Sequence, residues 1–189
     1  MIEYIKGKLN FKDSESAIID CGGVGYYISI SYNTYQDLPD VGDTSKLLIH
    51  LIHREDTMEL YGFSSEFERQ LFRKLINVSR IGPKLAIAIL SGSSPDRLSS
   101  AIELGDVKTI SKIPRVGKKT AERIVMELRG KLDIPTERLS ILDDDYLKAV
   151  EALVSLGYSR TEAAEAVNSA KELSPDATVD ELIKISLKK

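Results

Sequence analysis

Residue types that build many functional sites are scarce in this sequence of 189 residues. It has one cysteine, Cys21, and two histidines, His50 and His53. A single cysteine excludes an internal disulfide and a Cys-rich zinc site, and two histidines supply a His-ligated metal cluster poorly. We therefore expect no metal, no cofactor and a reducing environment.

Long apolar runs are missing as well. No run approaches the roughly 20 apolar residues that a membrane span needs. The first residues, MIEYIKGKLNF, lack the apolar core of a signal peptide. We therefore expect no contact with a membrane and a cytoplasmic location.

Charge is unevenly distributed along the chain, whose formal net charge is −3. Residues 1–63 carry 5 Lys and Arg against 10 Asp and Glu, residues 64–133 carry 14 against 8, and residues 134–189 carry 7 against 11. A basic middle between acidic ends indicates that one segment meets a polyanion. Chance clustering on solvated helices also produces charge imbalances of this size, so charge alone does not establish that this segment binds a polyanion.

Residues 1–63 have the pattern of short β-strands. Five runs rich in β-branched and aromatic residues are separated by turn signals such as Gly22-Gly23 and Gly42-Asp43, and these runs are YIKGKL, SAIIDC, VGYYISIS, KLLIHLIH and MELYGF. Five short strands in about 60 residues are typical of a small closed barrel. The pattern predicts an OB-fold barrel and leaves an SH3-like barrel open.

Residues 64–133 change to a helical period and are predicted to be all-α. Ser65 and Glu68 have the spacing of a capping box at the start of an amphipathic helix. A further short helix is expected around residues 95–103. The chain is thus predicted to be a multidomain β + α protein.

The C-terminal part is predicted to be a linker followed by a three-helix bundle. The mixed polarity and acidic run near residues 134–143 are typical of a linker, and residues 144–189 form the bundle. Ser159 and Glu162 form a second capping box, and Pro175 with Asp176 is expected to open the last helix. One apolar face is predicted on the first of these helices, comprising Leu147, Val150, Leu153, Val154 and Leu156.

Two short segments of the central region repeat one another. At an offset of 35 residues, RIGPKLAIAIL (80–90) aligns with RVGKKTAERIV (115–125), and five of the 11 pairs are identical. Such a match in a short window indicates a duplicated motif. In each copy a glycine, Gly82 or Gly117, is expected to permit positive φ or a close backbone approach in a tight turn before a helix.

Each repeated turn is a candidate phosphate site, because a helix start offers unpaired N–H groups and a positive dipole end. The structural alternative is two ordinary helix packings with solvated lysines. A P-loop is excluded, because Lys112 stands where its first glycine should be. The candidate residues for binding a phosphate polyanion such as DNA are Arg80, Ile81, Gly82, Pro83, Lys84, Arg115, Val116, Gly117, Lys118, Lys119, Thr120 and Arg123.

The repeated segments resemble helix-hairpin-helix motifs. With GGVGYYI, REDTMELYGF, IGPKLAIAILSG and VGKKTAERIVMELRGK, the chain is similar along its whole length to the RuvA family of bacterial Holliday-junction-binding subunits. The resemblance implies structure-specific binding that holds four-way junction DNA open and square-planar during recombination and DNA repair. It implies no catalytic residues in this chain, with ATP hydrolysis supplied by the partner RuvB.

The resemblance also implies an assembly and two further groups of site residues. The assembly is a homotetramer, alone or paired as an octamer, with the RuvC resolvase as a further partner. The loop residues Glu55 and Asp56 correspond to an acidic pin at the centre of the junction. Residues 144–189 resemble a ubiquitin-associated-type bundle that docks RuvB, with docking residues Leu156, Gly157 and Tyr158; a helix C-cap with core neighbours is the alternative for these three.

The sequence departs from the family pattern at Arg80 and Arg115, where the family usually has the first hairpin glycine. Loss of a flexible residue there affects the geometry of the turn, while an added arginine favours a phosphate electrostatically. Two other functions stay open on the residues alone, namely a general duplex-binding scaffold and a nuclease-associated subunit.

Overall fold

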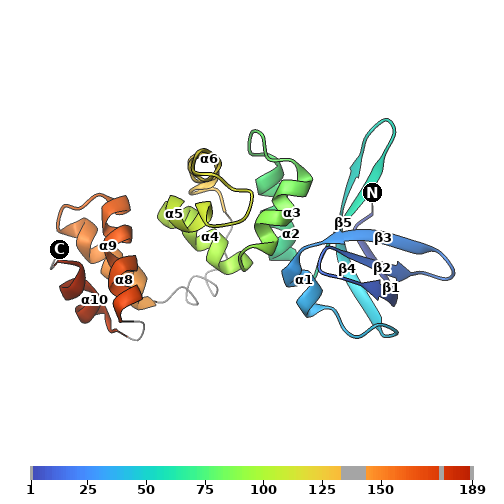
Figure 1. Cartoon of the computed structure of the whole chain (residues 1–189), viewed down its shortest axis with the longest axis horizontal. Helices are drawn as coiled ribbons and strands as arrows, with labels where there is room; N and C mark the ends of the chain where they lie inside the picture. The colour runs from blue at the N-terminus through green and yellow to red at the C-terminus, as the bar shows by residue number, and fades with distance from the viewer. Residues whose placement is uncertain (1, 133–143, 175–176, 188–189) are drawn as a thin grey trace. The chain divides into compact units, whose positions relative to one another are not determined.

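The computed structural model describes residues 2–132, 144–174 and 177–187, and the expected linker at 134–143 lies outside them. Contacts divide the chain into two compact units, Met1–Pro95 and Asp96–Lys189. The first unit contains a barrel and one helical hairpin, and the second contains helices (Figure 1).

Five strands close into a barrel in the order β1-β2-β3-β5-β4. β3 and β5 are parallel, and β1 closes the barrel by pairing with β4. The prediction of a five-stranded barrel is confirmed, and this strand order is that of the OB-fold. The strands are β1 Tyr4–Lys12, β2 Ser16–Asp20, β3 Gly25–Ile30, β4 Thr44–His53 and β5 Met58–Phe63.

The barrel core comes from the apolar positions that alternate along the strands. Ile5 and Leu9 on β1, Ile19 on β2 and Leu47 on β4 are all buried in one cluster. A short helix, α1 (Tyr32–Asp37), connects β3 to β4 and was not expected from the sequence. Its N-cap is Ser31, whose hydroxyl accepts the N–H of Thr34 at 3.1 Å.

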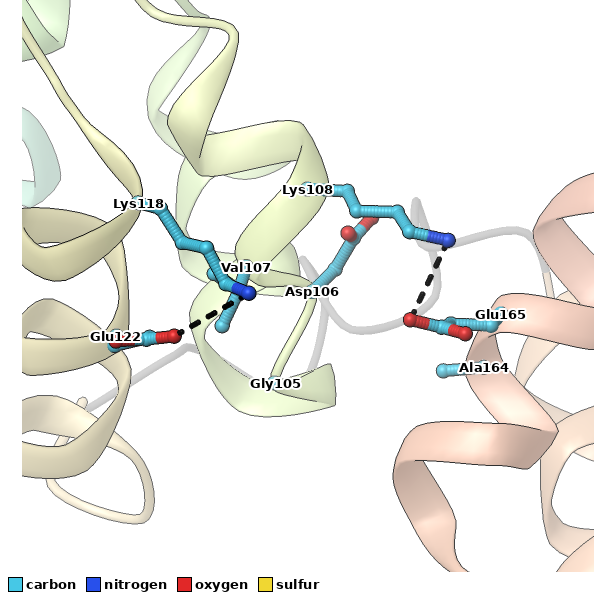
Figure 2. A pocket seen from close by; sticks show the side chains of 8 residues that line it. All are labelled: Gly105, Asp106, Val107, Lys108, Lys118, Glu122, Ala164 and Glu165. Atoms are coloured by element: carbon cyan, nitrogen blue, oxygen red, sulfur yellow. Dashed lines mark ion pairs between the residues drawn. The ribbon is translucent and has the colours of Figure 1, made fainter.

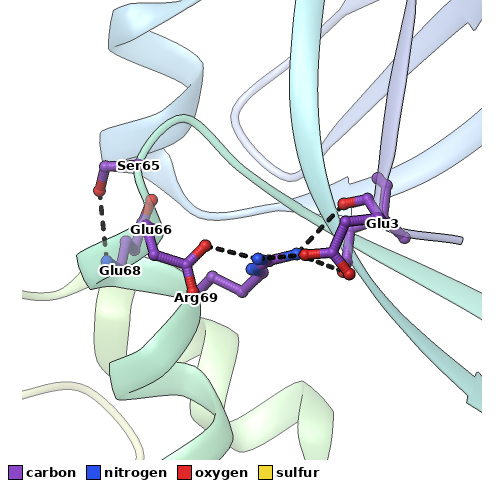
Figure 3. A network of polar contacts seen from close by, with 6 residues as sticks. Glu3, Ser65, Glu66, Glu68 and Arg69 are labelled. Atoms are coloured by element: carbon purple, nitrogen blue, oxygen red, sulfur yellow. Dashed lines mark hydrogen bonds and ion pairs between the residues drawn. The ribbon is translucent and has the colours of Figure 1, made fainter.

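The first hairpin consists of α2 (Glu66–Ile76) and α3 (Pro83–Ser91). Only half of the capping box expected at its start is present: the Ser65 hydroxyl accepts the N–H of Glu68 at 3.2 Å (Figure 3). The Glu68 carboxylate is instead buried and accepts hydrogen bonds from the hydroxyls of Ser31 and Thr34, the latter at 2.6 Å. The Glu68 side chain therefore does not bond the backbone N–H of Ser65, as a full capping box requires. It links α2 to α1 instead.

Arg69, the next residue of α2, ties the same helix to the barrel strands (Figure 3). Its guanidinium donates to the backbone oxygens of Glu3 and Ile49 at 3.1 and 3.3 Å. It also pairs with the carboxylates of Glu3 and Glu66, each at 2.5 Å. The side chain is only 6% exposed, so these bonds replace most of the water around a charge that is costly to bury.

The second unit is helical. It contains α4 (Pro95–Leu104), which confirms the short helix expected there, and α5 (Val107–Ser111), which the sequence analysis missed. These precede α6 (Lys118–Leu128), and the C-terminal bundle consists of α8 (Asp144–Ser155), α9 (Arg160–Leu173) and α10 (Val179–Ser186).

The caps of the bundle match the prediction in part. The capping box of Ser159 and Glu162 is confirmed. Helix α10 begins at Val179, and the N–H of its N-cap residue Thr178 donates to the Glu181 carboxylate at 3.0 Å. Pro175 and Asp176, which were expected to open this helix, lie outside the described residues.

Within the described ranges, none of the helices is both long and apolar enough to cross a membrane. The same ranges contain no group of three His, Cys, Asp or Glu residues placed to hold a metal ion.

Burial raises the pKa of Glu68 above its usual range, which predicts a pH-dependent stability. A carboxyl with a raised folded-state pKa stabilises the fold at low pH, and this contribution is lost as the pH rises through the folded pKa. We expect Glu68→Gln to gain stability relative to the natural chain between pH 4 and pH 8, measured by urea unfolding. Glu15→Gln, at an exposed carboxyl, is the control, and parallel pH profiles for Glu68→Gln and the natural chain would contradict the expectation.

Candidate nucleic-acid interface

The two repeated segments have the same backbone. In the first, the N–H of Ile81 donates to the oxygen of Val78 at 3.0 Å, and in the second Val116 donates to Ile113 at the same distance. In each copy the helix that follows has a glycine as its N-cap. The duplication predicted from the sequence is therefore confirmed in the fold.

The apolar residues of the turns are anchors rather than exposed contacts. Ile81 and Val116 are each 4% exposed, and Val78 and Ile113 are buried beside them. Ile81 and Val116 were among the candidate DNA-binding residues, and the structure places their side chains in the protein interior. Burying these four residues fixes each turn on the helices that flank it.

Positive φ occurs in these turns, but not at the glycines expected to adopt it. Gly82 and Gly117 have φ of −87° and −81° and extended ψ, which any residue adopts. The left-handed residues are Arg80 and Arg115, each with φ of 68°. The expectation of positive φ at Gly82 and Gly117 is thus wrong.

The second role expected of Gly82 and Gly117 is to let another molecule or chain segment approach the backbone closely, and the open space around both glycines is consistent with it. A Cβ atom built on Gly82 or Gly117 would meet no protein atom within 4 Å. The protein itself therefore does not require a glycine at either position. The missing side chain leaves open space in front of the helix start.

The two helix starts present unpaired backbone donors. Neither N-cap glycine offers a side-chain cap, and the first helical bond of α3 runs from Ala86 N–H to the oxygen of Gly82. Within the described chain, the N–H groups of Lys84 and Leu85 have no acceptor, nor do those of Lys118 and Lys119 in α6. Such a group of donors at the positive end of a helix favours an anion.

Cationic side chains surround both helix starts. Lys84 in the first copy and Lys118 and Lys119 in the second are exposed. Lys118 reaches along α6 to Glu122 at 4.0 Å (Figure 2), a solvent-exposed pair that contributes little stability. Pro83, Thr120 and Arg123, the other candidates on these helices, are half-buried.

The two acidic candidates lie at the tip of the β4–β5 hairpin, which projects from the barrel (Figure 1). The N–H of Arg54 donates to the oxygen of Thr57 at 2.8 Å and closes the loop. Glu55 and Asp56 are both exposed between them. The tip therefore carries two adjacent negative charges in solvent.

A hollow in the first unit joins this acidic hairpin to the first helix start. Tyr61 in its wall donates to the Glu59 carboxylate at 3.2 Å, and burial raises the pKa of Tyr61 to about 12. Sequence reasoning missed Arg54 and Tyr61 as neighbours of α3, because no local spacing links the hairpin to that helix. The hollow is lined by Arg54, Glu59, Tyr61, Gly82, Pro83, Lys84 and Leu85.

A second candidate surface lies at the end of α8. Leu156 and Tyr158 are 61% and 40% exposed, and Gly157 has φ of 98°, as is typical of a helix C-terminal glycine. The apolar face predicted for this helix is correct only in part: Val150 and Leu153 lie in the core, whereas Val154 and Leu156 are exposed. The side chain of Leu147 lies outside the described part.

Comparisons with known proteins cover nearly the whole chain. The model of the RuvA N terminal domain matches residues 1–62, that of the SAM-like helix-hairpin-helix tandem matches residues 72–131, and that of the RuvA C-terminal domain matches residues 149–189. Relatives from Delftia acidovorans and Polaromonas are 43% and 42% identical, across 100% of this chain and 98% of each relative. A relative from Chromobacterium violaceum is 43% identical with the same coverage. All three carry the name "Holliday junction branch migration complex subunit RuvA".

Proposed function

Because this chain belongs to the RuvA family, we propose that it binds four-way Holliday junction DNA as the non-catalytic subunit of a branch migration complex in recombination and repair. ATP hydrolysis belongs to its partner RuvB. The observation that carries the proposal is the hollow lined by both the acidic hairpin and the start of α3. It places the β4–β5 hairpin, which carries Glu55 and Asp56 at its tip, beside the start of α3, where Lys84 attracts phosphate.

The two helix starts are the proposed grips on the DNA backbone. At each one, unpaired N–H groups and a lysine side chain meet a phosphate, and the glycine N-cap lets the strand approach closely. Lys84 serves the first grip, and Lys118 and Lys119 serve the second. Phosphate contacts carry no base information, so recognition is of junction shape and weakens steeply with salt.

Glu55 and Asp56 are the proposed acidic pin. Two carboxylates next to DNA lower affinity, so their contribution is to specificity. At the centre of an open junction they repel the phosphates of strands that pass between arms. This repulsion keeps the strands separated, and it acts on a four-way junction far more than on a linear duplex.

The proposed assembly is a homotetramer whose four-fold symmetry matches the four arms of the junction. A second tetramer on the opposite face would enclose the DNA as an octamer, whereas a single one leaves that face open to the RuvC resolvase. The exposed apolar residues Leu156 and Tyr158, with Gly157 between them, are the proposed docking site for RuvB. The proposed place of action is the bacterial cytoplasm, where the chromosome lies.

Gly82→Ala and Gly117→Ala test the grips. The added methyl group meets no protein atom within 4 Å. The free energy of unfolding should therefore fall by about 1 kcal/mol or less for each change at an N-cap. Junction affinity, measured by fluorescence anisotropy, should fall at least tenfold in the double variant, because the methyl occupies space that the strand needs (about 1.4 kcal/mol).

The matched control for the glycines is Gly25→Ala on the barrel, where a Cβ would make an ordinary contact at 3.4 Å with Ile18. It should leave junction affinity unchanged. If the double glycine variant bound the junction as tightly as the natural chain does, the grips would be misplaced.

Glu55→Lys with Asp56→Lys tests the pin. Junction affinity should be kept or increased, because repulsion of phosphate is removed, while the ratio of junction to duplex affinity should fall. The control is Glu15→Lys with Asp43→Lys, which changes the same charge in other barrel loops. An equal response of junction and duplex binding would contradict the pin and favour a general duplex-binding scaffold.

A further inference from the structure

Arg80 and Arg115 stand out by their backbone conformation. Eight of the described residues have positive φ, and six of these are glycines. The other two are these arginines, each at φ of 68°. An L-residue with a Cβ in this region is strained, and arginine lacks the short polar side chain that lets asparagine adopt it.

The strain has the same local origin in both copies. The hydrogen bonds from Ile81 to Val78 and from Val116 to Ile113 each close a four-residue turn with arginine at the third position. In the second copy Pro114 occupies the second position. Positive φ at the third position, after proline at the second, is typical of a type II turn, whose third position favours glycine or asparagine.

No contact within the described protein offsets this strain. Both arginine side chains are exposed, and neither has a hydrogen bond or an ion pair to another described residue. A single strained arginine could be an accident of sequence. Two at equivalent positions of a duplicated motif indicate a common use outside the fold.

Their position points to the ligand. Each arginine lies two residues before the N-cap glycine, at the same end of the hairpin as the unpaired helix N–H groups. We propose that Arg80 and Arg115 are accessory contacts to DNA phosphates that lower folding stability while strengthening the grip of each hairpin. The inference rests on the proposed function and deepens it, since a guanidinium binds a phosphate through two parallel hydrogen bonds.

The test uses Arg80→Asn, Arg115→Asn and the double variant in the full-length protein. Asparagine suits positive φ, so the melting temperature should stay the same or rise. Binding to a synthetic four-way junction is measured from 50 to 200 mM salt. The slope of log affinity against log salt should become shallower by about 0.9 for each arginine removed from each bound chain.

Two further variants separate charge from conformation. Arg80→Lys with Arg115→Lys keeps both charges and both Cβ atoms, so most of the salt slope should remain. Lys8→Asn removes one exposed charge from β1, outside the repeated segments, and should leave the slope unchanged.

Three outcomes would overturn the inference. An unchanged slope in the double asparagine variant would show that the arginines do not contact phosphates. A clear fall in its melting temperature would show that the arginines stabilise the fold. A change in the native mass of the assembly, without a change in the salt slope, would show that Arg80 and Arg115 contact another copy of the chain. If the natural chain bound duplex as well as junction, the proposed function would fail, and the slopes measured on duplex would still decide the role of the arginines.

Discussion

The buried side chains of Glu68 and Arg69 fasten the first hairpin to the barrel, and the geometry of the candidate site depends on that link. Consecutive helix residues point in different directions, so Glu68 reaches Ser31 and Thr34 while Arg69 reaches the backbone next to β1 and on β4. Together these contacts tie α2 to α1 and to the barrel. The start of α3 therefore lies against the base of the acidic β4–β5 hairpin, around one hollow.

In each duplicated hairpin, one glycine was expected both to have positive φ and to permit a close approach, but two different residues have these properties. Gly82 and Gly117 have ordinary φ and leave room for a ligand, whereas Arg80 and Arg115 adopt the left-handed conformation that makes the turn. Buried Ile81 and Val116 between them hold the turn in place. In the proposed function, attraction at the helix starts is the source of affinity, and repulsion at the Glu55–Asp56 tip is the source of selectivity.

Features carried by local patterns could be predicted from the sequence, and features set by long-range contacts could not. Five short β-rich runs separated by turn signals predicted the barrel, and the offset of 35 residues predicted both hairpins. Helices α1 and α5 were missed, because six and five residues are too few to show a helical period. Spacing predicted a turn but not which residue has positive φ. The partners of Glu68 and the neighbours of Arg54 are far from them in sequence, so no local signal predicted either.

The contacts of Glu68 and Arg69 are expected to hold the acidic tip of the β4–β5 hairpin at a fixed distance from the first hairpin. Spin labels on Thr57→Cys and Asn77→Cys, in a Cys21→Ser background, report this distance by pulsed electron resonance. We expect one narrow distance distribution that junction DNA leaves unchanged and that Arg69→Met broadens. A broad distribution in the natural chain, or one that narrows only on DNA, would contradict it.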